Sequence, residues 1–216
     1  MTLEILNKQH QAIKKALETG ITGYTCIGTV FEEKYGKLKT RYSQGFPNMV
    51  RIEVDLPNGG MYVEGFNGNK AWEMDKIVDG RAYEALKQGA EWPSPIKSFV
   101  MFQDRGNKVD YIGEETRGND KFYIFKLSQI DGFERKYFVQ SENGLTYFAS
   151  DIRPLHPKED WREIETRFEN YKIFKGLSIP MKVVDRDVAS QEDLMYVEYN
   201  EIQISKDNNT TKFNKI

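Results

Sequence analysis

Residues 58–75 read Asn-Gly-Gly-Met-Tyr-Val-Glu-Gly-Phe-Asn-Gly-Asn-Lys-Ala-Trp-Glu-Met-Asp, and this stretch decides the fold that the sequence predicts. It has the pattern of two short strands joined by Asn67-Gly68, a pair that favours the positive φ angles of a type I′ turn. Met61 and Val63 share one face of the first strand, and Trp72 lies in the second. Because an isolated hairpin is marginal in water, this one is expected to belong to a larger sheet.

The strand pattern continues on both sides of this hairpin. In residues 49–56 apolar side chains alternate with charged ones, which indicates a strand with one buried face and one wet face. Short turns separate the early strands, so residues 24–75 are expected to form an antiparallel meander, and residues 107–204 a second strand group. Outside the hairpin, the candidate strands are 24–32, 37–44, 49–56, 108–115, 121–130, 133–140, 145–150, 161–173, 178–187 and 194–204.

The two ends of the chain differ from this pattern. Apolar residues recur every three or four positions from Leu3 to Leu17, which predicts an amphipathic N-terminal helix within residues 1–20. The C-terminal tail, residues 205–216, is rich in Asn, Lys and Thr and is expected to fray.

A helical insertion is expected in the middle of the chain, at residues 79–105. Pro93 and Pro95 divide it into two helical segments. The second segment contains four consecutive apolar residues, 99–102, and such a helix needs cover on more than one side. Two interpretations stay open: core packing, or a lid over an apolar cavity.

Together these elements predict an α+β fold that is mainly antiparallel β. About 11–12 strands are too many for a flat sheet, so the sheet is expected to curve into an unclosed β-barrel. The N-terminal helix and the central helical lid would cover its concave face. Residues 1–216 are expected to form this single domain.

Composition narrows the class of partner and the compartment. Charged residues make up 30% of the chain but the formal net charge is only −2, so no basic surface for nucleic acid is predicted. Apolar runs are far shorter than the roughly 20 residues of a membrane span. The N-terminus lacks the pattern of a signal peptide, so a periplasmic or envelope location is expected only if such a peptide has been removed.

Catalytic chemistry is not indicated. The chain has two histidines, His10 in the N-terminal helix and His156 in a loop, and neither has companions at the spacing of a metal site or proton relay. No nucleophile elbow, phosphate loop or dinucleotide fingerprint is present. Cys26 lies within a strand pattern, where a buried small hydrophobe is expected. We therefore expect a protein that is not an enzyme and that has no metal or cofactor.

Three motifs resemble those of a known family. They are Gly65-Phe66-Asn67-Gly68 followed by Trp72, Tyr137-Phe138 followed by Asn143-Gly144-Leu145, and Asn170-Tyr171 followed by Gly176-Leu177-Ser178-Ile179-Pro180. Their order around a central helical insertion resembles the LolA/LolB-like lipoprotein carriers, which sort outer-membrane lipoproteins. The resemblance runs from about Leu3 to Ile204. It implies an unclosed β-barrel capped by helices that cover an apolar cavity.

One position departs from that family. The carriers have an Arg-Pro pair at the end of the second strand, and its arginine holds the helical lid. The corresponding pair here is Phe46-Pro47, and phenylalanine cannot donate the hydrogen bonds of an arginine. Arg41 and Arg51 are near in sequence but do not match the family position, so the latch is not carried over.

The resemblance implies a non-catalytic carrier that holds the acyl chains of a lipid or lipoprotein between sheet and lid helices. Burial of acyl chains gains on the order of 0.8 kcal/mol per CH₂ and needs no specific polar residue. The alternative is an envelope interaction or regulatory domain of the same fold, with a filled core. Such a domain would bind a protein partner at an exposed groove or at the loop 153–160. The expected lining of the apolar cavity is Ile52, Val54, Met61, Val63, Trp72, Phe99 and Phe102.

Overall fold

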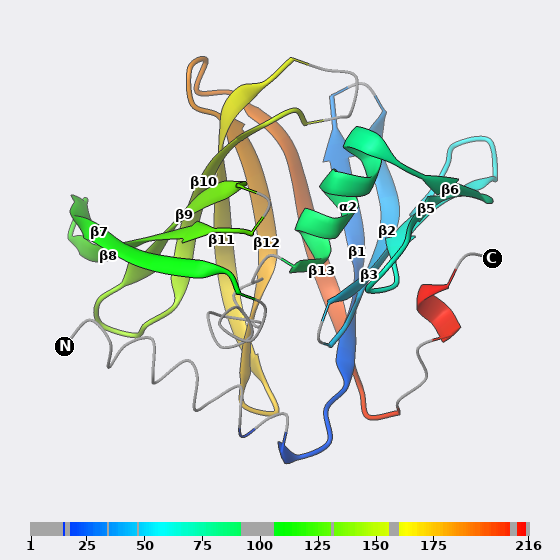
Figure 1. Ribbon diagram of the computed structural model, residues 1–216, viewed down its shortest axis with the longest axis horizontal. Helices are drawn as coiled ribbons and strands as arrows, with labels where there is room; N and C mark the ends of the chain where they lie inside the picture. The colour runs from blue at the N-terminus through cyan, green and yellow to red at the C-terminus, as the bar shows by residue number, and fades with distance from the viewer. Residues whose placement is uncertain are drawn as a thin grey trace. The chain divides into compact units, whose positions relative to one another are not determined.

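The computed structural model describes residues 15, 18–33, 35–46, 48–91, 106–130, 132–155, 160–207 and 211–214 (Figure 1). Within these residues the chain forms thirteen strands, the helix α2 (Gly80–Glu91) and the short 3-10 helix η1 (Thr211–Phe213). The strands are β1 (Gly23–Glu32), β2 (Gly36–Gly45), β3 (Met49–Asp55), β4 (Met61–Phe66), β5 (Ala71–Glu73), β6 (Lys76–Val78), β7 (Lys108–Arg117), β8 (Asp120–Ser128), β9 (Glu134–Gln140), β10 (Thr146–Arg153), β11 (Arg162–Phe174), β12 (Leu177–Asp187) and β13 (Asp193–Ser205).

The strands belong to one sheet with the order β6-β5-β4-β3-β2-β1-β13-β12-β11-β10-β9-β8-β7. Neighbours pair antiparallel, as β1 does with β2 and β11 with β12. Because β6 and β7 stand at the two ends of this order, the sheet is not closed. The predicted fold class, a mainly antiparallel and unclosed β-barrel with a helix, is confirmed. The prediction of 11–12 strands missed β6, which is only three residues long.

Contacts divide the chain into two compact units. The first unit contains residues 17–92 and 195–216, and with them β1–β6, α2 and η1. The second unit contains residues 1–16 and 93–194, and with them β7–β12. The expected single domain over residues 1–216 stays a prediction.

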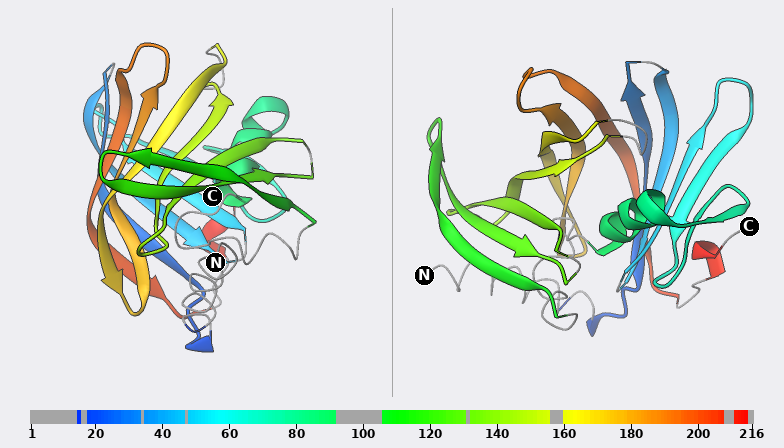
Figure 2. Two further views of the ribbon diagram at one scale, coloured as in Figure 1. Left: turned by 90° about the vertical axis from the view of Figure 1, so that its left-hand side faces the viewer. Right: turned by 45° about the horizontal axis from the view of Figure 1, so that its top comes forward.

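In the first unit, α2 lies over strands β3–β5 (Figures 1 and 2). The helix follows Asp79, whose carbonyl accepts the N–H of Tyr83. Leu86 and Ala90 are four residues apart, so they point to the same side of the helix, and both are buried. This confirms that the insertion begins as a helix. The rest of residues 79–105, with Phe99 and Phe102, lies outside the described residues, and so does most of the expected helix at 1–20.

In the second unit, long hairpins carry a core of large side chains. Tyr123, Phe125 and Leu127 alternate along β8 and are buried, and Phe125 pairs with the buried Tyr137 of β9. The β11–β12 hairpin turns at Lys175-Gly176, where both φ angles are positive, 49° and 85°. This is the backbone that a two-residue type I′ turn requires.

The turn within residues 58–75 is different from the one predicted. Strands β4 and β5 are joined by the four residues 67–70; Gly68 has a positive φ of 93°, but Asn67 does not have a positive φ. Instead the Asn67 side chain closes the loop, because its Oδ1 accepts the N–H groups of Asn69 and Lys70 at 3.1 and 2.9 Å. An asparagine that caps a loop in this way has no need of the left-handed conformation.

The expectation of a frayed tail is wrong for its described part. Residues 211–213 form η1, and the ring of Phe213 is only 2% exposed. Burial of this aromatic ring favours a docked position for the described part of the tail.

Candidate functional site

The register of β2–β5 sorts the side chains of the first unit onto two faces. Val50 pairs with Phe66 and Ile52 with Glu64, while Arg51 pairs with Gly65 and Gly65 in turn with Trp72. Paired residues in antiparallel strands point to the same side of a sheet. One set is therefore on the side of α2, here called the α2 face (Tyr42, Val50, Ile52, Phe66, Ala71 and Val78). The opposite side carries η1 and is called the η1 face (Gly45, Arg51, Glu53, Gly65 and Trp72).

The α2 face is apolar beneath the helix. Leu86 and Ala90 of α2 pack with Val50, Phe66 and Ala71 in one buried cluster. Its half-buried border consists of apolar and aromatic side chains: Tyr42, Ile52, Val78 and Tyr83. The ring of Tyr83 meets that of Phe66 edge-on, with 5.9 Å between centroids. A small number of helix side chains thus cover a wider apolar surface of the sheet.

Two polar groups accompany this surface. Gln44 is fully buried, and its Oε1 accepts hydrogen bonds from the hydroxyls of Tyr24 and Tyr42 at 3.2 and 2.9 Å. The hydroxyl of Tyr62 donates to Glu64 Oε2 at 2.7 Å. Burial and the neighbouring Glu64 carboxylate both raise the pKa of Tyr62, so it stays a protonated donor at all ordinary pH values.

The residues predicted to line a cavity divide between the two faces. Ile52 borders the α2 cluster, and Val54, which pairs with Tyr62, is on the same face. Val63 and Trp72 are buried on the η1 face, and Met61 is on that face with 38% of its surface exposed. Ligand binding by any of these residues stays a prediction.

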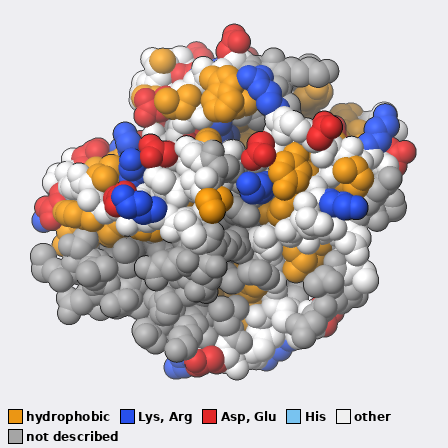
Figure 3. Space-filling model, viewed as in Figure 1, with side chains coloured by type: hydrophobic (Ala, Val, Ile, Leu, Met, Phe, Trp, Pro, Cys, Tyr) orange, Lys and Arg blue, Asp and Glu red, His pale blue; other side chains and the backbone are white. Residues whose placement is uncertain are grey.

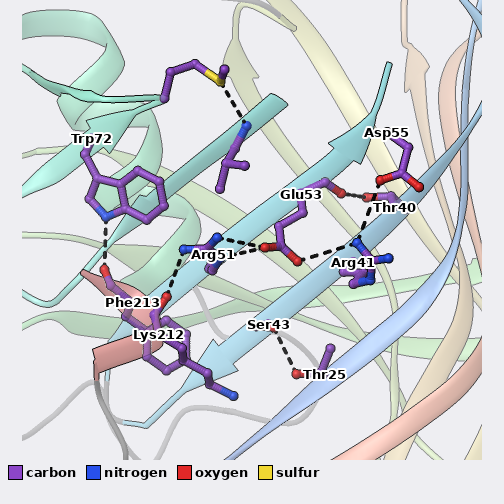
Figure 4. Close-up of polar contacts among 12 residues, drawn as sticks. Thr25, Thr40, Arg41, Ser43, Arg51, Glu53, Asp55, Trp72, Lys212 and Phe213 are labelled. Atoms are coloured by element: carbon purple, nitrogen blue, oxygen red, sulfur yellow. Dashed lines mark hydrogen bonds and ion pairs between the residues drawn. The ribbon is translucent and has the colours of Figure 1, made fainter. Parts of the chain in front are cut away.

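The η1 face holds residues that the sequence analysis did not select. The indole Nε1 of Trp72 donates to the carbonyl of Phe213 at 2.9 Å, and Arg51 Nη1 donates to the carbonyl of Lys212 at 3.1 Å (Figure 4). Phe213 is the one aromatic residue after Tyr199, within an otherwise polar tail. That isolation is the signal by which the contact could have been found.

The second unit contains a buried group of charges that joins β9 to β12. Arg135 Nε lies 3.0 Å from Asp151, Arg153 Nε lies 2.9 Å from Asp151, and Arg153 Nη2 lies 2.9 Å from Asp185. The hydroxyl of Thr166 donates to Asp185 at 2.6 Å. Burial alone would raise the pKa of Asp185, but the Arg153 charge and the Thr166 hydrogen bond outweigh it and lower the pKa. Two arginines and two aspartates balance, so this group has the character of a structural ion network.

Reactive groups are few in the described part of the chain. Cys26 is buried as predicted, and burial raises the pKa of its thiol to about 12, which keeps it protonated and unreactive. No three His, Cys, Asp or Glu side chains of the described residues are placed to hold a metal ion. His10 and His156 lie outside these residues. Figure 3 shows acidic and basic side chains mixed over the surface in view, with hydrophobic ones between them.

The Phe46-Pro47 position is partly described. Pro47 lies outside the described residues, whereas Phe46 is half-buried and its ring packs at 6.4 Å from that of Tyr24. Phe46 therefore makes an aromatic contact at this position. No helix within the described ranges is both long and apolar enough to cross a membrane.

Comparisons with known proteins place this architecture. No protein-family model matches the sequence, and a search of curated proteins finds no significant match. Among solved structures, an outer membrane lipoprotein-sorting protein domain from Vibrio parahaemolyticus matches with a TM-score of 0.65 and 12% identity, over 99% of this chain and 96% of that one. A LolA superfamily protein from Nitrosomonas europaea matches with a TM-score of 0.58 and 13% identity, over 89% of each chain. The chain has a LolA-like fold.

A third structure extends the comparison. A DUF1329 family protein from Desulfovibrio piger matches with a TM-score of 0.56 and 8% identity, over 98% of this chain and 95% of that one. At such identities the likeness establishes the LolA-like fold and leaves the activity to be argued from the residues.

Proposed function

We propose that this protein is a non-catalytic carrier that binds acyl chains of a lipid or lipoprotein on the α2 face. The observation that carries the proposal is that α2 covers an apolar sheet surface with few side chains of its own. Val50, Phe66 and Ala71 of the sheet are buried in one cluster with Leu86 and Ala90 of the helix. The LolA-like fold, shared with a domain named for lipoprotein sorting, supports this choice of ligand.

The energetics favour a sheet surface on which acyl chains can replace the helix α2. The sheet beneath α2 is held by its own antiparallel hydrogen bonds, which do not depend on the helix. If the helix moves away, Ile52 and its neighbours become exposed to water, which is unfavourable. Acyl chains that bind there offset this cost, because each buried CH₂ contributes about 0.8 kcal/mol. Val54 lies on the same face, so a chain can follow strand β3 from Val50 to Val54, past the Glu64 carboxylate that pairs across from Ile52 and accepts the Tyr62 hydroxyl. No charged group is required for such a site.

A second function has one observation in its favour. The cluster beneath α2 is filled by side chains, with Ala71 and Ala90 at 0% exposure. A filled core fits the envelope interaction or regulatory domain, in which the helix never leaves and a protein partner binds elsewhere. The two functions differ in whether the α2 face takes up an apolar ligand.

The compartment belongs to the same proposal. A carrier of lipid or lipoprotein acyl chains would work in the periplasm or elsewhere in the cell envelope, as the name of the Vibrio outer membrane lipoprotein-sorting domain also suggests. Fractionation of cells that produce the native protein checks this: recovery with envelope fractions supports it, and recovery only with cytoplasmic markers contradicts it.

Uptake of a fluorescent fatty acid by two matched variants tests the site. Ile52→Glu places a charge on the α2 face, whereas Ile77→Glu places it at an exposed position opposite Trp72. We expect Ile52→Glu to weaken uptake at least tenfold because the charge must be buried beside the acyl chain. Ile77→Glu should bind like the native protein.

Circular dichroism of both variants gives the control for folding. Native protein that takes up no fatty acid, and whose organic extract contains no lipid by mass spectrometry, would contradict the carrier function and favour the interaction domain.

A further inference from the structure

The η1 face contains a seat for one aromatic ring, and the ring of Phe213 fills it. A Cβ atom built on Gly45 would lie 2.6 Å from Cε2 of Phe213 and 2.9 Å from the end of the Met49 side chain. No side chain larger than hydrogen at position 45 leaves room for that ring. The glycine of β2 and the aromatic residue of η1, far apart in sequence, thus form a matched pair.

Side chains of the sheet hold the segment around this ring by its acceptor groups. Trp72 Nε1 donates to the Phe213 carbonyl and Arg51 Nη1 to the Lys212 carbonyl, at 2.9 and 3.1 Å (Figure 4). Asn67 Nδ2 donates to Oδ1 of Asn214 at 3.1 Å. Two of the three acceptors are main-chain carbonyls, which every peptide has. The contacts therefore recognise a backbone shape and one ring, and little else of the sequence.

The seat is built from contacts that do not involve η1. Arg51 Nε and Nη2 donate to Oε1 of Glu53 at 2.9 and 2.8 Å, which fixes the direction of the guanidinium. That guanidinium lies 5.3 Å from the ring centroid of Trp72. The indole rests on Gly65, where a Cβ atom would lie 2.6 Å from Cζ2. Each of these contacts is made within strands β3 to β5.

The contacts that dock residues 211–214 are of a kind that another peptide can replace. The buried Phe213 ring, the three hydrogen bonds from the sheet and a hydrogen bond from Lys212 Nζ to Ser205 Oγ at 3.4 Å stabilise the docked segment, and the conformational entropy lost by its residues opposes them. The segment follows β13 through the polar stretch Lys206-Asp-Asn-Asn-Thr210.

We propose that this seat is a peptide-binding site, with the C-terminal segment as its intramolecular ligand. The ligand class is a peptide in which one aromatic residue lies between accessible main-chain carbonyls. When such a peptide from another protein binds, it displaces residues 211–214. The site is on the face opposite the acyl-chain site, so this proposal stands or falls independently of the carrier function.

A labelled peptide and full-length variants test the proposal. The peptide carries residues 206–216 with fluorescein at its N-terminus, and its binding is followed by fluorescence anisotropy. The full-length Phe213→Ala protein has an empty ring seat and should bind the peptide saturably. Native protein should bind it at least tenfold more weakly, because its own tail competes.

Two controls make the test specific. A Phe213→Ala change in the peptide should weaken binding at least tenfold. Gly45→Ala added to the Phe213→Ala protein should do the same, because the new methyl group occupies the seat. If Phe213→Ala does not fold, the Phe213→Leu protein replaces it, with intermediate affinity expected.

Equal binding with and without Gly45→Ala, or no binding by either Phe213 variant at millimolar peptide, would overturn the proposal. Analytical ultracentrifugation of the native protein tests whether the tail of a second copy of this chain occupies the seat instead. A dimer that Phe213→Ala abolishes would assign the seat to the tail of a second copy and overturn a foreign peptide as ligand.

Discussion

Gly65 shows how a single residue fixes the contact between two strands and an indole. A Cβ atom there would lie 2.6 Å from Cζ2 of Trp72 and 2.7 Å from the backbone oxygen of Val50. The oxygen belongs to the β3–β4 ladder and cannot move without loss of pairing. The position therefore tolerates no side chain for steric reasons, and no unusual φ angle is involved.

We predict that Gly65→Ala lowers the free energy of unfolding by about 1–3 kcal/mol, the usual cost of overpacking. Gly89→Ala is the matched control, because no atom lies within 4 Å of a Cβ built there and the residue is in α2. That change should stabilise by about 0.5–1 kcal/mol through helix propensity. Urea unfolding measures both, and a Gly65→Ala protein as stable as the native one would contradict the prediction.

The sequence reaches the residue scale only in part. Trp72 correctly marks the hairpin in the sequence. Its hydrogen bond to Phe213, which lies 141 residues away, cannot be predicted from local periodicity. Asn67-Gly68 has the composition of a type I′ turn, yet the Asn67 side chain closes a longer loop. Propensity describes which turns are possible, and side-chain hydrogen bonds select among them.

At the scale of elements, α2 is the part whose attachment decides the proposed function. Its buried contact comes from Leu86 and Ala90, on a surface that strands β3, β4 and β5 supply. A helix of twelve residues has little stability of its own in water, so tertiary packing maintains it.

We predict that Leu86→Ala loosens α2 more than it loosens the sheet. The lost packing should cost about 2 kcal/mol. Hydrogen exchange followed by mass spectrometry should show faster exchange in residues 80–91 and unchanged exchange in β1 and β2. Ala85→Ser, at an exposed position of the same helix, is the control and should change little. Equal acceleration throughout the first unit would mean that α2 cannot move separately.

Strand alternation predicted much at this scale. The alternation of residues 49–56 correctly separated Val50, Ile52 and Val54 from Arg51 and Glu53. What alternation could not supply is which face the helix covers, since Val63 and Trp72 are as buried as Val50. Both faces of these strands pack against apolar groups. A period of two residues therefore does not indicate which face packs against the helix.

At the scale of the whole molecule, the charges give the stability a dependence on pH. The pKa of Asp185 is lowered in the folded protein, whereas an aspartate in an unfolded chain has a pKa of about 3.9. The unfolded state therefore binds the proton more readily, and folding is stabilised above pH 4. This stabilisation is lost as the pH falls below about 4 and through the folded pKa.

We predict that the urea midpoint of the native protein falls between pH 5 and pH 2.5, and that Asp185→Asn makes this fall shallower. Asp185→Asn should also be less stable at pH 7, because Arg153 loses a charged partner. Asp193→Asn, at a more exposed carboxylate whose pKa is also lowered, is the control and should lose less stability at pH 7. An Asp185→Asn protein with the native pH profile would contradict the assigned role.

The order of strands and turns was enough to predict the LolA-like fold at identities of 8–13% to solved structures. Such an order survives because turn residues and alternating strands are local properties. The docked tail and the ion network around Asp151 join residues far apart in sequence, and no local pattern predicts them.

One measurement tests the proposed carrier most directly. A fatty acid that carries a nitroxide near the end of its chain is added to protein labelled with ¹³C at isoleucine methyl groups, and the methyl resonances are recorded. We predict strong broadening of Ile52 on the α2 face and little broadening of Ile77 on the opposite side of the sheet. Broadening of Ile77 equal to that of Ile52, or no broadening of Ile52 at saturating fatty acid, would contradict acyl-chain binding on the α2 face.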